Sequence, residues 1–256
     1  MNDSARTIET SDEDGVRYLH FGSEWVQGAM RIARPFALEL EYTREMMLAL
    51  ALRHEAYWPR RVLQVGLGAA SIAKFLYRQR PRSHQTIVEI DPGVARIAAQ
   101  RFRLPDDPAR LALHFADGVA WMKTDRHAYD LIVVDGYDRH ARFGALGTED
   151  FYRDCRARLN KGGLLTLNLF GRARGYARQL AALENVFGAR VLALPANDDG
   201  NAIVFATVGA ALVPDLPSLE AACTQLARET GIKWGASLVR LRRALSQCKE
   251  GHKRAG

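Results

Sequence analysis

The chain has 256 residues, of which 48% are hydrophobic and 25% are charged, and its formal net charge is +7. This length and composition support one large domain with a buried core, or one domain with a small appendage. No run of about 18 apolar residues is present, so the sequence offers no membrane-spanning helix. The polar, acidic start of the chain lacks the pattern of a secretory signal, and we expect a cytoplasmic protein.

The basic charge is gathered largely in the C-terminal segment, residues 240–254. The aromatic interleaving of a single-strand nucleic-acid binder is absent, so a nucleic-acid partner is not expected. We interpret this segment as a solvated helix that packs on a sheet edge through Leu238, Leu241 and Leu245. An anionic partner is the alternative.

Three cysteines, Cys155, Cys223 and Cys248, lie far apart in the chain. They have neither the spacing of metal ligands nor the even count of a disulfide framework. We therefore expect reduced cysteines and no metal site.

From residue 61 onward, apolar runs alternate with helical stretches. The expected strands are 61–65, 85–90, 111–115, 130–134, 164–169, 190–194 and 202–208. The expected helices are 71–79, 92–102, 118–123, 148–159 and 176–187. This alternation predicts an α/β fold with a mostly parallel sheet that is covered on both faces. Because the last two strands follow one another without a helix, we expect seven strands, the last inserted antiparallel.

The flanking segments do not follow this alternation. Residues 1–58 form a short N-terminal lobe in our interpretation, with a strand at 16–21 and a helix at 42–53. Residues 59–210 form the nucleoside-binding domain, and residues 211–256 form a basic tail of one or two helices.

Glycines or acids follow four consecutive strands of the expected sheet. They are Gly66 and Gly68, then Glu89, then Asp117 with Gly118, and finally Asp135 and Asp138. Ligands of open parallel sheets bind beyond these carboxyl ends. Glycines bring backbone N–H groups close to a ligand, and an acid about 20 residues further on suits the hydroxyls of a ribose.

Without a phosphate-binding lysine, this pattern predicts an adenosine-type ligand that carries no pyrophosphate. Each position also has a purely structural reading. The glycines can form tight turns, Asp91 and Asp117 can cap helices, and Asp138 can be a turn residue.

The chain resembles the spermidine synthase (polyamine aminopropyltransferase) family. The resemblance runs in family order through about residues 17–208, in the stretches YLHFGSEWVQGAM, EYTREMM, VLQVGLGAAS, VEIDPGV, FADGVAW, YDLIVVDGYD and FYRDCRARLNKGGLLTLN. It implies a Rossmann-like sheet of the S-adenosylmethionine-methyltransferase type. It also implies transfer of an aminopropyl group from decarboxylated S-adenosylmethionine to a polyamine such as putrescine, with release of methylthioadenosine. No tightly bound cofactor is implied.

The resemblance also implies a role for each site residue. The nucleoside site comprises Gln27 and Glu89 on the ribose, Asp117 on the adenine edge, and Gly66, Gly68 and Gly118. The amine site comprises Asp135 as general base, with Asp138, Tyr42 and Tyr137 as substrate-binding residues. Polyamines are cations at neutral pH, so one carboxylate can accept a proton while a second holds charge.

Two departures from the family pattern keep other functions open. Ala69 stands where the family has an Asp that, by the resemblance, binds the aminopropyl ammonium and repels the carboxylate of S-adenosylmethionine. Arg139 and His140 follow Asp138, where the family has a Pro. One alternative is therefore an S-adenosylmethionine-dependent methyltransferase or aminocarboxypropyl transferase. Another is a non-catalytic nucleoside-binding relative, against which the retention of Asp135 and Asp138 argues. The oligomeric state stays open, with a homodimer among the alternatives.

Overall fold

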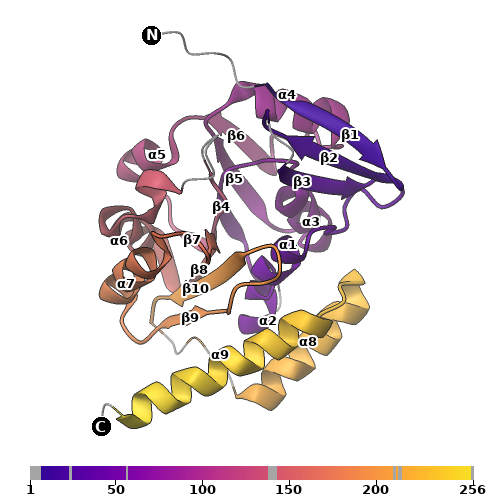
Figure 1. The fold of residues 1–256 in the computed structure, drawn as a ribbon. Helices are drawn as coiled ribbons and strands as arrows, with labels where there is room; N and C mark the ends of the chain where they lie inside the picture. Colours follow the sequence, from indigo (N-terminus) through magenta and orange to yellow (C-terminus); the bar gives the residue numbers. More distant parts are fainter. Residues whose placement is uncertain are drawn as a thin grey trace.

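The computed structural model describes residues 7–22, 25–55, 57–137, 143–209, 212 and 215–254, with only the backbone of residues 247–254. Figure 1 shows a large twisted sheet with helices on both faces and a small N-terminal sheet beside it. The large sheet contains β4 (Arg61–Val65), β5 (His84–Glu89), β6 (Leu111–Phe115), β7 (Tyr129–Val134), β8 (Leu159–Phe170), β9 (Val191–Ala193) and β10 (Asn201–Thr207). Their order is β6-β5-β4-β7-β8-β10-β9.

The prediction of seven strands with an antiparallel last strand is confirmed. The strands from β4 to β8 pair in parallel, and β10 lies between β8 and β9 and runs antiparallel to both. This order brings the carboxyl ends of β4, β5 and β7 together at the middle of one sheet edge, and the site is built at that edge.

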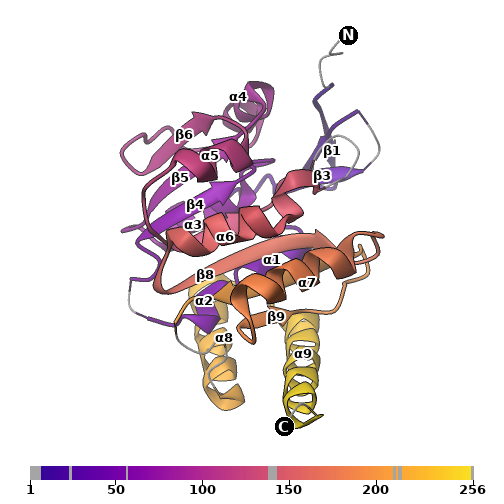
Figure 2. The same ribbon diagram turned by 90° about the vertical axis from the view of Figure 1, so that its left-hand side faces the viewer.

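The two faces of the sheet bury alternate residues of each strand, as the pleat requires. On β7, Leu131 and Val133 pack into the hydrophobic cluster of one face, whereas Ile132 and Val134 pack into the cluster of the other. The helices that follow β4 to β8 are α3 (Ser71–Gln79), α4 (Pro92–Arg101), α5 (Gly118–Thr124), η1 (Gly144–Gly147, a 3-10 turn), α6 (Glu149–Arg158) and α7 (Tyr176–Phe187). Figure 2 shows α6 and α7 lying along one face.

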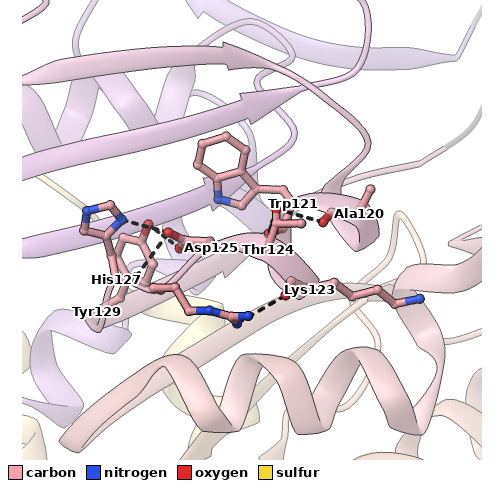
Figure 3. A network of polar contacts seen from close by, with 8 residues as sticks. Ala120, Trp121, Lys123, Thr124, Asp125, His127 and Tyr129 are labelled. Atoms are coloured by element: carbon pink, nitrogen blue, oxygen red, sulfur yellow. Dashed lines mark hydrogen bonds and ion pairs between the residues drawn. The ribbon is translucent and has the colours of Figure 1, made fainter.

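The connection between α5 and β7 is tied by one carboxylate, that of Asp125 (Figure 3). Its oxygens accept hydrogen bonds from His127 Nδ1 at 2.7 Å and from the Tyr129 hydroxyl at 2.8 Å. Burial acts to raise the pKa of Asp125, but these hydrogen bonds outweigh it and lower the pKa. Burial raises the pKa of Tyr129 to about 12, so its hydroxyl remains a donor. The network fixes the start of the strand whose other end carries Asp135.

The N-terminal segment contains more structure than the sequence predicts. It contains a three-stranded antiparallel sheet of β1 (Glu9–Glu13), β2 (Val16–His20) and β3 (Val26–Arg31), of which only β2 was expected. β3 buries Gly28, Ala29 and Met30. The sheet is also tied to the end of α4, because Arg17 donates to the Arg101 carbonyl at 2.8 Å.

The single helix expected at 42–53 is two helices, α1 (Glu41–Met46) and α2 (Ala49–Leu52). The turn that joins the two helices has hydrogen bonds between residues three apart in the chain. For example, the Met47 N–H donates to the Arg44 carbonyl at 3.0 Å. This turn lets the chain bury every side chain from Met46 to Leu52. Both helices pack in the same hydrophobic cluster as β4, β7 and β8. The boundary expected near residue 58 stays a prediction, and this packing favours a boundary before α1.

The C-terminal segment forms α8 (Leu216–Thr230) and α9 (Gly235–Arg254), which lie below the large sheet in Figures 1 and 2. Leu241 and Leu245 are buried, and Leu238 packs against the same cluster, as the sequence predicted. The Trp234 indole N–H donates to the Cys223 carbonyl at 2.8 Å and joins the two helices. In the part of the chain that the structure describes, no helix combines the length and apolar character needed to cross a bilayer.

Candidate functional site

A cavity of about 660 Å³ opens at the carboxyl ends of β4, β5, β7 and β8. Its wall includes most of the residues that the sequence assigned to a site: Gln27, Tyr42, Gly66, Gly68, Glu89, Asp117, Asp135 and Tyr137. These residues come from β3, α1 and four strand ends, and the fold brings them into one space. Asp138 lies outside the described residues.

Glu89 ends β5 with its carboxylate held by the backbone. One oxygen accepts from the N–H of Leu67 at 2.9 Å, and the other accepts from the N–H of Asp91 at 2.9 Å. The first of these bonds ties the acid to the glycine-rich turn after β4. The carboxylate is therefore held in a fixed position at the cavity wall.

Gly66 lets the ends of β4 and β7 close against each other. Its φ is +89°, and a Cβ atom there would lie 2.2 Å from the Asp135 carbonyl oxygen. Only glycine satisfies both conditions at this position. The turn after β4 thus lies directly beside Asp135.

Asp117 caps a helix and also lies on the cavity wall. One of its carboxylate oxygens caps α5 by accepting from the N–H of Ala120 at 2.9 Å, and the side chain also lines the cavity. Gly118, expected at the nucleoside site, is not on the cavity wall. It is buried in the first turn of α5, where a Cβ atom would lie 2.5 Å from Val65 Cγ1. Its role is close packing of the helix on β4.

Asp135 directly follows β7, is half-buried and lies on the cavity wall. One carboxylate oxygen accepts from Asn168 Nδ2 at 3.1 Å, and the Tyr42 hydroxyl also donates to this carboxylate. Burial raises the pKa of Asp135, and the two hydrogen bonds only partly oppose that effect. A raised pKa makes this carboxylate a stronger base than an exposed aspartate.

The two tyrosines beside Asp135 differ in what their hydroxyls do. Burial and the nearby Asp135 charge raise the pKa of Tyr42 well above its usual value, so Tyr42 remains a neutral donor. The Tyr137 hydroxyl donates to the backbone carbonyl of Asn168 at 2.7 Å, and its ring lies 5.4 Å from that of Phe143. Tyr137 therefore shapes the wall with its ring.

Several lining residues were not found from the sequence: Trp25, Asn168, Phe170, Asp199 and Asn201. Asn168 is 3% exposed, and its Oδ1 has no hydrogen-bond partner among the described residues. Its amide orientation is fixed because the Nδ2 group must face the Asp135 carboxylate. An amide inside the apolar stretch LTLNLF is the signal that could have identified it.

The cavity is acidic although the protein is basic. Its described lining contains Glu89, Asp117, Asp135 and Asp199, and no Lys, Arg or His. The whole chain has a net charge of +7. A concave wall of one charge sign concentrates oppositely charged ligands, so this cavity is suited to a cation.

Ala69 does not lie on the cavity wall. Its side chain is buried against β3, where a Cβ atom on Gly28 would lie 2.6 Å from the Ala69 Cβ.

The described residues contain no group of three or more His, Cys, Asp or Glu side chains placed to hold a metal ion.

Known proteins resemble this chain in sequence and in fold. The family model of the spermine/spermidine synthase domain matches residues 40–169. A polyamine aminopropyltransferase of Neisseria meningitidis is 34% identical over 92% of this chain and 89% of its own length. That of Chromobacterium violaceum is 34% identical over 96% of this chain and 92% of its own length.

Solved structures share the fold. Human methyltransferase-like protein 13 in complex with SAH is 26% identical, with a TM-score of 0.68 over 76% of this chain and 94% of that chain. A probable spermidine synthase from Corynebacterium glutamicum is 22% identical, with a TM-score of 0.74 over 88% of this chain and 85% of that chain. At that identity, the second likeness concerns the fold alone.

Proposed function

The chain belongs to the spermine/spermidine synthase family, and we propose that it transfers an aminopropyl group from decarboxylated S-adenosylmethionine to a small polyamine such as putrescine. Methylthioadenosine would be the second product. The observation that carries this proposal is the acidic cavity around Asp135, which suits two cationic substrates. The location in the cytoplasm and the assembly as a homodimer are further proposals.

The donor would bind over the β4 and β5 side of the cavity. Glu89 and Gln27 would hold the ribose hydroxyls, and the free oxygen of Asp117 would accept from the adenine amino group. The turn at Gly66 would then place the sulfonium beside Asp135. Because the donor is itself a cation, the acidic wall would favour its entry.

The amine would react as a neutral nucleophile. Its lone pair would attack the carbon next to the sulfonium, forming a C–N bond while the C–S electron pair returns to sulfur. The proton lost from nitrogen would pass to Asp135, whose raised pKa suits a general base. The Tyr42 and Asn168 hydrogen bonds would hold the carboxylate in the orientation that receives this proton.

A second candidate is transfer from intact S-adenosylmethionine, of either its methyl or its aminocarboxypropyl group. The sequence favours it, because Ala69 replaces the acid that, by the resemblance, repels the carboxylate of S-adenosylmethionine, although the Ala69 side chain does not face the cavity in the structure. The acidic cavity lining argues against it.

Calorimetry on the purified protein separates the two candidates. The ligands are methylthioadenosine, decarboxylated S-adenosylmethionine and S-adenosylmethionine, followed by turnover with putrescine. We expect the decarboxylated donor to bind more tightly than the intact one and to yield methylthioadenosine with the amine. Equal or tighter binding of S-adenosylmethionine would make the second candidate the leading one.

A further inference from the structure

The basic C-terminal segment reaches the helix that carries Tyr42. Arg240 of α9 forms an ion pair with Glu45 and contacts Glu41 Oε1 at 3.0 Å, and both acids belong to α1. The side chain of Arg240 is 17% exposed and that of Glu45 is 1% exposed, so solvent screens their interaction little. The sequence predicts a solvated helix in this segment, yet one of its arginines is directed into the protein.

α1 depends on contacts from distant parts of the chain. It has six residues, and its N-cap residue, Leu40, provides no side-chain hydrogen bond. So short a helix is not stable in water by itself. In addition, Glu45 lies near its C-terminal end, where the helix dipole disfavours a negative charge. The Arg240 guanidinium offsets that charge and joins two positions one helical turn apart.

α1 is held by polar contacts at two places besides its apolar packing. The Thr43 and Arg44 side chains donate to nearby backbone carbonyls, at residues 40 and 39, over 2.7 and 2.8 Å. Those bonds shape the segment but do not fix it relative to the sheet. Among the described residues, its side chains form hydrogen bonds to distant segments only with α9 and from Tyr42 to Asp135.

α9 is itself fixed independently of Arg240. Leu241 and Leu245 are buried in the hydrophobic cluster that also contains Met46 of α1. Just before the helix begins, the Trp234 indole N–H donates to the Cys223 carbonyl of α8 at 2.8 Å. The guanidinium therefore projects from a rigid support, and it can determine where α1 lies.

The position of α1 matters to Asp135 because the Tyr42 hydroxyl donates to its carboxylate. This hydrogen bond favours the charged form of Asp135, whereas burial opposes it. Tyr42 and Tyr137 are the titratable side chains beside Asp135 in the described part of the chain. Burial raises the pKa of both hydroxyls, so both stay neutral. If α1 moves and the Tyr42 contact breaks, Asn168 is the remaining hydrogen-bond partner of the carboxylate.

We infer that Arg240 is a positioning residue of the active site, because it holds α1 where the Tyr42 hydroxyl meets the Asp135 carboxylate. This inference rests on the proposed function, in which Asp135 accepts the amine proton, and it gives the C-terminal helix a part in that step. Arg240 does not line the cavity. It acts through one helix and one hydroxyl, without touching a substrate.

The test is the pKa of the Asp135 carboxyl, measured by NMR of the side-chain carboxyl carbon in protein labelled at aspartate. Loss of the signal in Asp135→Asn assigns it. Arg240→Gln removes the charge of the guanidinium, and Arg240→Lys restores a charge. Arg242→Gln is the matched control, since Arg242 is on the same helix and its ion pair with Glu220 is partly exposed. Each variant is also made together with Tyr42→Phe.

Tyr42→Phe should raise the pKa of Asp135, and Arg240→Gln should cause a large part of the same rise. In the Tyr42→Phe protein, Arg240→Gln should have little further effect, since the hydroxyl through which it acts is absent. Arg240→Lys should restore most of the original pKa, and Arg242→Gln should leave it unchanged. An equal rise with and without the Tyr42 hydroxyl would overturn the inference, because the Arg240 charge would then act on Asp135 directly. So would an unchanged pKa in Arg240→Gln.

Glu41→Gln gives a second test that keeps the pair with Glu45. Its side chain is 26% exposed, so the fold should tolerate the change even if Arg240→Gln does not fold. Removal of a negative charge acting directly on Asp135 would lower its pKa. Loosening of the contact between α1 and α9 should instead raise it, through the loss of the Tyr42 hydrogen bond. A lowered or unchanged pKa in Glu41→Gln would overturn the inference.

The titration does not depend on catalysis. If no amine is turned over with decarboxylated S-adenosylmethionine, the proposed function fails, and the pKa values still decide whether Arg240 positions Tyr42. Where turnover is measured, Arg240→Gln should lower kcat about tenfold at neutral pH and leave the KM of the donor unchanged.

Discussion

Arg240 of α9 forms an ion pair with Glu45 of α1, whose side chain is only 1% exposed. The same guanidinium contacts Glu41 Oε1 at 3.0 Å, so it bridges two acids that flank Tyr42 on α1. Burial raises the pKa of Glu45, and the Arg240 charge opposes that effect. The basic C-terminal helix thus supports the helix that carries the partner of Asp135.

Arg240→Ala should lower the free energy of unfolding by about 3–5 kcal/mol, because it leaves a buried carboxylate without its counter-charge. Urea denaturation measures this loss. The matched control is Arg242→Ala on the same helix, whose ion pair with Glu220 at 2.7 Å is partly exposed on both sides. That change should cost less than about 1 kcal/mol. Equal losses in the two variants would show that the buried ion pair with Glu45 stabilises the fold no more than the exposed pair with Glu220 does.

The buried Lys74 should make stability depend on pH. It is 1% exposed, its Nζ donates to the Phe102 carbonyl at 2.6 Å, and burial lowers its pKa from 10.5 to about 7. Between these two values the unfolded chain holds more protons at this site than the folded chain. Its contribution to the free energy of unfolding therefore rises with pH, starting near pH 7 and levelling off near 10.5.

Between pH 6 and pH 9 this rise amounts to about 2–3 kcal/mol. The measurement is urea denaturation at both pH values, with Lys74→Met and the exposed Lys123→Met as a pair. Other groups also titrate between pH 6 and pH 9. The contribution of Lys74 is therefore read from the difference between the two variants in their gain in the free energy of unfolding. Lys74→Met should show a smaller gain from pH 6 to pH 9 than Lys123→Met. The same gain in both would mean that Lys74 keeps an ordinary pKa.

Local patterns predicted the strands of the large sheet and the helices that cover it, but only one strand, β2, of the small sheet. The strand 61–65 and the helices 71–79 and 176–187 have the predicted bounds, because apolar runs, helical periodicity and terminal glycines are properties of neighbouring residues. β3 was missed because Gly28, Ala29 and Met30 are buried in succession, without the alternation typical of a strand.

The candidate site was predicted where glycines and acids directly follow strands. Asn168 and Asp199 were missed because an amide within an apolar strand and an acid within a turn-rich loop do not alter any periodicity. Only the strand order brings Asn168 into contact with Asp135 and Asp199 onto the wall of the same cavity. The assignment of Asp138 to the amine site stays a prediction.

Asp135→Asn should reduce the rate of aminopropyl transfer by about 10²–10⁴-fold, since an amide cannot accept the amine proton. Methylthioadenosine should still bind, because the residues proposed to hold the ribose and the adenine, Gln27, Glu89 and Asp117, do not include Asp135. Turnover and calorimetry on the same preparation measure the two effects. Loss of methylthioadenosine binding would instead indicate that Asp135 maintains the shape of the site.

Asn168→Ala should move the acid limb of the kcat profile to higher pH. The hydrogen bond from Asn168 Nδ2 favours the charged form of Asp135, so its removal raises the pKa of that carboxyl further. Because the base must be deprotonated to act, the rate should then begin to fall at a higher pH than in the unmodified protein. The measurement is kcat against pH at saturating substrates. An unmoved limb combined with a lower kcat at every pH would assign Asn168 to substrate binding alone.

Ala69→Asp tests whether the family's missing acid can simply be restored. By the resemblance, an acid at this position repels the carboxylate of S-adenosylmethionine, so its return would be expected to weaken the binding of that donor. In the structure, Ala69 is 3% exposed and packs on Gly28, and its cluster includes Leu19, Met30 and Phe102. A carboxylate there is forced into apolar surroundings or displaces β3, which also carries Gln27.

We therefore expect Ala69→Asp to weaken the binding of methylthioadenosine, decarboxylated S-adenosylmethionine and S-adenosylmethionine alike, and to lower the thermal midpoint. Ala69→Ser is the matched control, since a hydroxyl adds little volume and no charge. Calorimetry with the three ligands, together with a thermal unfolding curve, measures both effects. A selective loss of S-adenosylmethionine affinity at unchanged stability would contradict this expectation. It would mean that the side chain at position 69 reaches the cavity after all.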